Sequence, residues 1–128
     1  MRMIDTIFDR CGGYVRVAQI VLAFYDRVLQ SQRLRKIFID TDMRRLVDHQ
    51  AKFMSAIMGG PKSYTDEEIS AVHRSLPIDD LMFDEMARLL RMTLSDFRLD
   101  EEDLRFVLVE FQSRRPLVVH RRAVDAAP

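Results

Sequence analysis

Residues 42–78 read DMRRLVDHQAKFMSAIMGGPKSYTDEEISAVHRSLPI, and this stretch decides the fold. It combines two of the three histidines with the clearest break between helical segments. Its first half has the spacing of an amphipathic helix that carries His49 and Gln50. A Gly59-Gly60-Pro61 corner follows, and a second short helix is predicted to end just after His73. Two helices hinged in this way can face each other across a flat ligand.

Local signals mark the ends of these two helices. Asp42 is a predicted N-cap, because its carboxylate can accept a hydrogen bond from a free backbone N–H of the first turn. Thr65 and Glu68 have the spacing of a capping box, which predicts that the second helix starts there. Pro77 disfavours helical geometry at Leu76 and therefore ends that helix.

Further signals concern the first helix of this stretch and the later helices. Asp79 or Asp80 can cap the helix that follows Pro77, and Asp100 with Asp103 offers another cap before the last helix. The inward face of the helix that carries His49 is predicted to consist of Leu46, Gln50, Phe53, Met54 and Ile57.

The segments outside this stretch are also helical in pattern. Apolar residues recur every three or four positions over residues 3–10, 14–29, 80–97 and 103–115, each of which is predicted to be a helix. Gly12-Gly13 separates the first two of these helices, and residues 30–40 are predicted to form an irregular turn with a short helix. Pro116 is predicted to bend or end the last helix, with a frayed tail from Arg121. No strand-like alternation is present, so the sequence predicts an all-α fold.

Composition narrows the class of protein. A chain of 128 residues fits one domain, 1–128, with a core from about residue 7 to 115 and a C-terminal tail over 116–128. Twenty Lys and Arg residues balance twenty Asp and Glu residues, which leaves no basic field for nucleic acid or anionic lipid. The single cysteine, Cys11, excludes an internal disulfide and multi-cysteine metal sites. Without a signal-peptide pattern or an apolar run of about 18 residues, the sequence predicts a cytoplasmic protein with no membrane contact.

Three polar residues stand on helix faces that are otherwise apolar. His73 lies on the inward side of its short helix, where it could be an axial metal ligand or a core histidine bonded to a backbone carbonyl. Tyr25 and Gln50 could bond each other or the backbone, or could direct donors at a ligand held in the core. An unpaired amide or phenol in such a place costs about 1–3 kcal/mol, so each is expected to have a partner.

Other candidates have a structural interpretation beside the functional one. His49 lies about 100° around the helix from Gln50, so it could flank the same cavity or point to water. Arg44, Arg45 and Lys52 could pair with a ligand carboxylate or form a solvated face. Several apolar residues surround the polar trio and could be plain core or a cofactor pocket: Phe24, Phe38, Leu46, Phe53, Met54, Leu76 and Phe83.

Taken together, these residues resemble the truncated haemoglobins, the two-over-two α-helical globins, and most closely their first group. The resemblance runs from about Ile7 to about Phe111. Its matching pieces, in order, are Phe24-Tyr25-Asp26-Arg27-Val28-Leu29, Phe38, Asp42-Met43, Leu46, His49-Gln50, Phe53, Gly59-Gly60-Pro61, Tyr64, His73, Ile78 and Phe83.

The resemblance implies a non-covalent haem b cofactor whose iron is bound by His73 on the proximal side. Tyr25 would donate its hydroxyl to bound dioxygen with support from Gln50, and Leu46 would form a dry distal gate. The complete set of predicted haem-contacting residues is Phe24, Tyr25, Phe38, Arg45, Leu46, His49, Gln50, Phe53, Met54, Tyr64, His73, Leu76 and Phe83. His120 is out of register with the histidine that bonds covalently to a haem vinyl in certain relatives.

The implied function is reversible binding of dioxygen, nitric oxide and carbon monoxide by a monomer or weak dimer. Conversion of nitric oxide to nitrate is compatible with the family but needs a separate reductase, because no flavin or nicotinamide motif is present. Some relatives use a histidine at the place of His49 as a second iron ligand. Ligation by His49 would favour the alternative of a six-coordinate sensor or redox carrier. A haem-free helical interaction module is the third hypothesis.

Two positions depart from the family pattern. Asp66 and Pro77 stand where glycine is common in the family, and both flank the predicted His73 helix. The flexibility of that corner is therefore expected to differ from that of relatives, with the predicted capping box at Thr65 supplying local order.

Overall fold

The computed structural model describes residues 6–60 and 76–119 of the chain. This part is helical and contains no strand, so the predicted all-α fold is confirmed. None of its helices is both long and apolar enough to cross a bilayer. The elements are α1 (Ile7–Cys11), α2 (Gly13–Gln30), the 3₁₀-helix η1 (Arg35–Phe38), α3 (Met43–Ile57), α5 (Asp80–Asp96), α6 (Glu101–Ser113) and α7 (Arg115–Val118).

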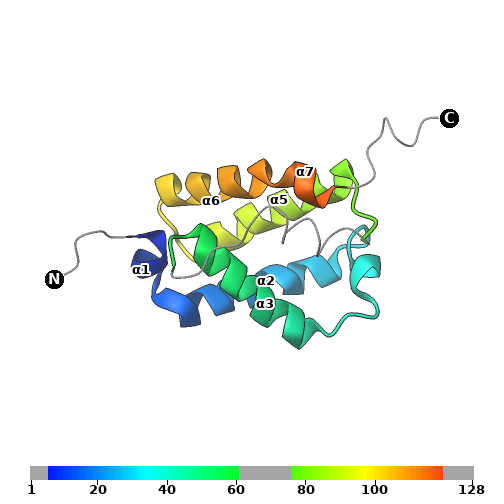
Figure 1. Ribbon diagram of the computed structural model, residues 1–128, viewed down its shortest axis with the longest axis horizontal. Helices are drawn as coiled ribbons and strands as arrows, with labels where there is room; N and C mark the ends of the chain where they lie inside the picture. The colour runs from blue at the N-terminus through cyan, green and yellow to red at the C-terminus, as the bar shows by residue number, and fades with distance from the viewer. Residues whose placement is uncertain (1–5, 61–75, 120–128) are drawn as a thin grey trace.

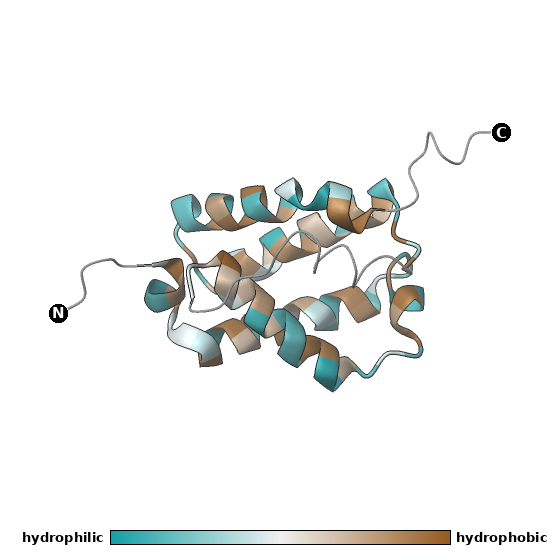
Figure 2. Ribbon diagram, viewed as in Figure 1, coloured by the Kyte–Doolittle hydropathy of each residue, from teal (hydrophilic) through white to brown (hydrophobic). Residues whose placement is uncertain are grey.

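The long helices are arranged in two pairs. Helix α2 packs across α3 in one pair, and α5 runs beside α6 in the other (Figure 1). Contacts between α2 and α5 join the pairs, which gives the predicted two-over-two sandwich. Figure 2 shows hydrophobic and hydrophilic residues interleaved along each helix, as expected where one face of a helix is buried and the other is solvated.

Helix α2 supplies the centre of the core. Its buried residues follow a spacing of three and four, which places them on one face of the helix. Helix α5 has a matching face, on which Phe83, Leu90 and Leu94 are almost completely buried. The inward-facing residues of α2 are Val17, Ile20, Val21, Phe24 and Val28.

The predicted helix ends are largely confirmed. Asp42 accepts a hydrogen bond from the Arg45 backbone N–H at 3.3 Å, and Asp79 accepts one from the Met82 backbone N–H at 2.8 Å. Gly12, with φ of 116°, ends α1 in a left-handed conformation that favours glycine. Asp100 stands at the start of α6 without a side-chain capping bond, so its predicted cap is not formed.

A second glycine turn closes α3 and docks α1 onto it. Gly59 has φ of 93°, and a Cβ placed there would lie 3.0 Å from the Thr6 Cβ. The Phe8 backbone N–H donates to the Met58 carbonyl at 2.9 Å in the same place. The predicted corner therefore begins at Gly59, whereas Pro61, the capping box at Thr65 and the His73 helix lie outside the described residues.

The structure revises two details of the sequence pattern. Met54 and Ile57 of the predicted inward face of α3 are buried, together with Ala51 and Ser55, whereas the other predicted residues are half-buried. These half-buried residues are Leu46, Gln50 and Phe53. Ser55 is tolerated in the core because its hydroxyl donates to the Ala51 carbonyl at 2.8 Å. At the C-terminal end, Pro116 lies in the first turn of α7, and buried Val118 and Val119 extend the core beyond the predicted limit near residue 115.

Candidate functional site

A cavity lies between the two helix pairs. It encloses about 720 Å³ of space free of atoms, and this volume includes space that is open to solvent. Most of its lining is apolar or aromatic, with three polar side chains among them. The lining residues are Phe24, Tyr25, Phe38, Leu46, Gln50, Phe53, Leu76, Ile78, Phe83, Met86, Phe111, Arg114 and Val118.

Packed aromatic rings form much of the wall. The Tyr25 ring meets Phe24 edge-on at 4.9 Å between centroids and Phe38 at 5.8 Å, which joins α2 to η1. On the other side, Phe83 of α5 and Phe111 of α6 are stacked at 4.7 Å. Such contacts fix the orientations of the rings within each wall.

Tyr25 and Gln50 bring polar atoms into this apolar space. Tyr25 comes from α2 and Gln50 from α3, and both side chains line the cavity. Neither makes a side-chain hydrogen bond to another residue in the described ranges 6–60 and 76–119. Burial raises the pKa of Tyr25, so its hydroxyl keeps its proton and is a donor at neutral pH. Within the described residues, the Tyr25 hydroxyl and the Gln50 amide are thus available to donate hydrogen bonds to a polar ligand in the cavity.

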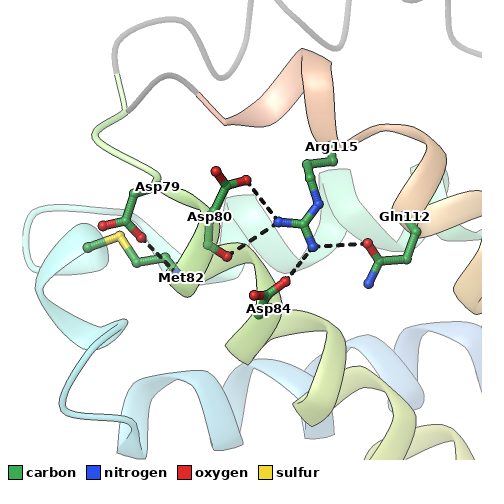
Figure 3. A network of polar contacts seen from close by, with 6 residues as sticks. All are labelled: Asp79, Asp80, Met82, Asp84, Gln112 and Arg115. Carbon is green, nitrogen blue, oxygen red and sulfur yellow. Dashed lines mark hydrogen bonds and ion pairs between the residues drawn. The ribbon is translucent and has the colours of Figure 1, made fainter. Parts of the chain in front are cut away.

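An ionic cluster, shown in Figure 3, fixes the end of the cavity near α7. The Arg115 guanidinium donates to the Asp80 carboxylate at 3.0 Å, to Gln112 Oε1 at 3.1 Å and to the Asp84 carboxylate. Burial by itself lowers the pKa of Arg115, but the two carboxylates outweigh it and the net shift is upward. The Arg115 Cζ also lies 4.5 Å from the centroid of the Phe83 ring. Arg115 therefore ties α7 to the first turn of α5 and steadies one wall residue.

Several predicted residues lie elsewhere. His49 and Arg45 are exposed and border a surface depression with Asp48 and Lys52, which is distinct from the cavity but shares Leu46 with it. Met54 is buried in the core rather than in the cavity wall. Tyr64 and His73 lie outside the described residues.

The structure brings together eight of the predicted residues, all of which line the cavity: Phe24, Tyr25, Phe38, Leu46, Gln50, Phe53, Leu76 and Phe83. It adds five that were not among the predicted haem-contacting residues: Ile78, Met86, Phe111, Arg114 and Val118. Met86 and Phe111 belong to predicted helix stripes and Ile78 belongs to the resemblance, so the sequence indicated their burial, whereas Val118 belongs to neither. Arg114 carried no signal of its own, because an arginine near a helix end is usually solvated.

Comparison with solved structures defines the class of protein. The structure is similar to the two-over-two haemoglobin of Synechococcus sp. in the cyanomet state with covalently attached haem, at a TM-score of 0.84 and 27% identity. The similarity covers 91% of this chain and all of that one. The all-α sandwich around one cavity is therefore the two-over-two globin fold.

Sequence comparison gives the family. The model of the bacterial-like globins matches residues 6–115. The chain is 30% identical over 102 residues to a group 1 truncated haemoglobin of Synechocystis sp., covering 77% of this chain and 82% of the relative. It is 26% identical over 102 residues to one from Tetrahymena thermophila, covering 80% and 84%. The chain belongs to the bacterial-like globin family, within its group 1 truncated haemoglobins, and is therefore a haem protein.

The cavity fits haem. Its apolar and aromatic walls suit a large flat ring, and Tyr25 and Gln50 supply donors on one wall only. The opposite wall, from α5 to α7, presents apolar side chains and Arg114. The predicted proximal ligand, His73, lies outside the described residues.

Proposed function

We propose that this chain binds haem b non-covalently in the cavity and reversibly binds dioxygen, nitric oxide and carbon monoxide, with His73 as the proximal iron ligand. The haem iron supplies the site at which a diatomic ligand binds. The observation that carries the proposal is the pair of polar side chains, Tyr25 and Gln50, that reach an otherwise apolar cavity without a partner among the described residues.

Tyr25 would act as the main donor toward a bound ligand. Its raised pKa keeps the phenol protonated, and its ring is held edge-on by Phe24 and Phe38, so the hydroxyl direction is preset. A hydrogen bond to partial negative charge on a ligand is stronger in this water-poor space than in solvent. Gln50, from the facing helix, supports the same ligand through its amide group.

Leu46 and the phenylalanines of the cavity wall would limit the entry of water into the cavity. Leu46 lies one turn before Gln50 on α3 and borders both the cavity and the outer depression. An apolar side chain at this boundary adds no donor and limits water entry, which protects the Tyr25 hydrogen bond from competition.

Conversion of nitric oxide and dioxygen to nitrate is a further part of the proposal. The reaction leaves the iron ferric, so each turnover needs one electron from outside. The sequence contains no flavin or nicotinamide motif, and a separate reductase is therefore required. A cytoplasmic location and a monomeric or weakly dimeric state remain part of the same proposal.

The position of His49 favours reversible ligand binding over the six-coordinate sensor or redox carrier. His49 is exposed and borders the outer depression, so it would have to swing toward the cavity to reach iron. Such a movement would break the interaction that His49 makes in its present position on α3. The six-coordinate state is therefore the less supported alternative.

Absorption spectra of the purified protein test these assignments. We expect a Soret band in the wild type and its loss, or loss of tight haem retention, in His73→Ala. His49→Ala serves as the matched control and should keep the wild-type spectrum. Unchanged haem retention and spectrum in His73→Ala would remove His73 from the proximal role. A low-spin ferrous spectrum that disappears in His49→Ala would select the six-coordinate alternative, and no Soret band after haem titration would select the haem-free module.

A further inference from the structure

Arg114 brings a positive charge to the cavity at the junction of α6 and α7. Among the described lining residues it is the one charged side chain, and its neighbours there include Phe53, Phe111 and Val118. A guanidinium against an apolar wall loses hydration, and this loss must be offset by hydrogen bonds or an ion pair. The position of Arg114 therefore raises the question of what pairs with it.

The hydrogen bonds of Arg114 use only one of its nitrogens. Nη1 donates to the Glu110 carbonyl at 2.6 Å, contacts Ser113 Oγ at 3.5 Å and lies 3.6 Å from the Glu110 carboxylate. Nε is buried and has no hydrogen-bond partner, and Nη2 makes no hydrogen bond within the described part of the chain. One whole edge of the guanidinium, from Nε to Nη2, is therefore unused.

The unused edge has the geometry of an oxyanion site. Two parallel N–H groups on one edge of a guanidinium match the two oxygens of a carboxylate, and such paired bonds are shorter and stronger than neutral ones. The Arg114 Cζ lies 5.6 Å from the Phe53 ring centroid, which holds the side chain beside the cavity. The side chain is 23% exposed, so it has room to turn this edge toward a bound group.

Arg115, the next residue, differs from Arg114 in how its charge is paired. Arg115 pairs with Asp80 and Asp84 through its two terminal nitrogens and also bonds Gln112, so both terminal nitrogens have carboxylate partners. Arg114 has one carboxylate nearby, Glu110, at the long distance of 3.6 Å and partly exposed, which gives a weak pair. Adjacent positions in the same turn thus differ in whether their charge is satisfied by the protein.

We propose that the Nε–Nη2 edge of Arg114 is an oxyanion-binding position at the α6–α7 end of the cavity. It takes a planar carboxylate or a similar small anion. The source is either a carboxylate of the haem itself or a free anion such as formate or nitrite. The inference rests on the proposed haem binding where the source is the cofactor.

The rate of haem loss tests whether the group bound by Arg114 is a carboxylate of haem. The wild type, Arg114→Gln and the control Arg105→Gln are each loaded with haem or with its dimethyl ester, and transfer to a haem scavenger is timed. Arg105 is the matched control because it lies on α6 with 73% of its side chain exposed. If haem supplies the carboxylate, Arg114→Gln speeds loss of haem about tenfold but leaves the dimethyl ester unaffected.

Titrations of the ferric protein with formate and nitrite, followed by the Soret band, test whether Arg114 binds a free anion. A free-anion site predicts that Arg114→Gln weakens binding about tenfold while haem loss is unchanged. Arg114→Lys keeps the charge without the paired edge and should restore only part of the effect. Equal haem loss and equal anion affinity in wild type and Arg114→Gln would overturn the proposal.

Failure of haem binding is separable from failure of this inference. If no variant gives a Soret band, the haem assignment fails by itself. Formate titration of the haem-free chain, followed by the NMR signal of the Arg114 Nε–H, then decides the anion position. A formate-dependent shift of that signal supports the site, and its absence at saturating formate overturns it.

Discussion

The ionic cluster formed by Arg115 with Asp80, Asp84 and Gln112, called the clamp from here on, differs from the cavity around Tyr25 in how polar groups are paired. In the clamp, Arg115 is paired with Asp80, Asp84 and Gln112 across two helices. In the cavity, the polar ends of Tyr25 and Gln50 have no side-chain partner among the described residues. The clamp joins α5, α6 and α7, whereas the cavity lies between the two helix pairs.

The comparison separates groups that stabilise the fold from groups available to a ligand. A paired polar group contributes to folding and is lost at a cost in stability. A polar group without a protein partner inside an apolar cavity does not stabilise the fold, since it loses hydration without forming a hydrogen bond to the protein. Substitutions in the clamp should therefore change stability, and substitutions in the cavity should change ligand kinetics.

The largest expected effect is on stability, in Arg115→Met. The change removes the ion pairs to Asp80 and Asp84, which are partly solvated, and the contact with Phe83, for a loss of about 2 kcal/mol in the free energy of unfolding. Chemical denaturation of the haem-free chain measures it. Arg91→Met is the control, since its single contact with Glu101 is exposed and 3.5 Å long. Equal losses in the two variants would break the distinction between clamp and surface pairs.

Next in size is the effect of Tyr25→Phe on ligand release. Loss of one good hydrogen bond, about 1–2 kcal/mol, should speed dioxygen dissociation around tenfold. The free energy of unfolding of the haem-free chain should not fall, because no protein partner is lost. Tyr14→Phe is the matched control, since the Tyr14 hydroxyl donates to Asp48 on the surface at 3.2 Å. An unaltered dissociation rate, measured by stopped flow, would remove Tyr25 from the distal role.

Gln50→Leu should have a smaller effect in the same direction. As the supporting donor, Gln50 is expected to contribute less than Tyr25, so dissociation should quicken about threefold, or about 0.7 kcal/mol. Gln112→Leu makes the same change in the clamp, where Gln112 accepts from Arg115 at 3.1 Å. That control should alter stability slightly and leave dissociation untouched. Faster dissociation in Gln112→Leu, with only a change in stability in Gln50→Leu, would contradict the roles assigned to the clamp and the cavity.

The smallest expected effect is the pH dependence of the Tyr25 phenol. Burial raises its pKa above the ordinary value near 10, so the folded chain keeps a proton that the unfolded chain has released above that pH. The free energy of unfolding should thus be unaffected by Tyr25 below about pH 10 and fall as pH rises further. Tyrosinate absorbance should rise equally in wild type and Tyr25→Phe up to about pH 11. A smaller rise in Tyr25→Phe than in the wild type below about pH 11 would contradict the raised pKa.

Local signals predicted the helices well because they depend on neighbours in sequence. The periodic apolar residues of α2 and the capping carboxylates of Asp42 and Asp79 are visible in the sequence and are confirmed. Asp100 has the same residue type at a helix start, yet its side chain makes no capping bond. A cap thus needs a suitable side-chain rotamer as well as a suitable residue, and the rotamer is set by packing.

Burial on α3 was harder to predict. Met54 and Ile57 are buried as predicted, and the structure buries Ala51 and Ser55 as well. The other predicted inward residues, Leu46, Gln50 and Phe53, are half-buried. Neighbouring stripes on one helix are separated by a small rotation, so the partner helix decides which stripe is buried. Here α2 covers one stripe of α3, and the other borders the cavity.

By itself, the sequence determined the all-α class, most helix bounds and the residues Tyr25 and Gln50 as polar groups on apolar faces. Only the tertiary structure decided that these two side chains share a cavity, that His49 borders a different depression and that Arg114 reaches the cavity wall with an unused edge. The reason is that periodicity depends on a helix alone, whereas a cavity depends on how several helices are oriented around it.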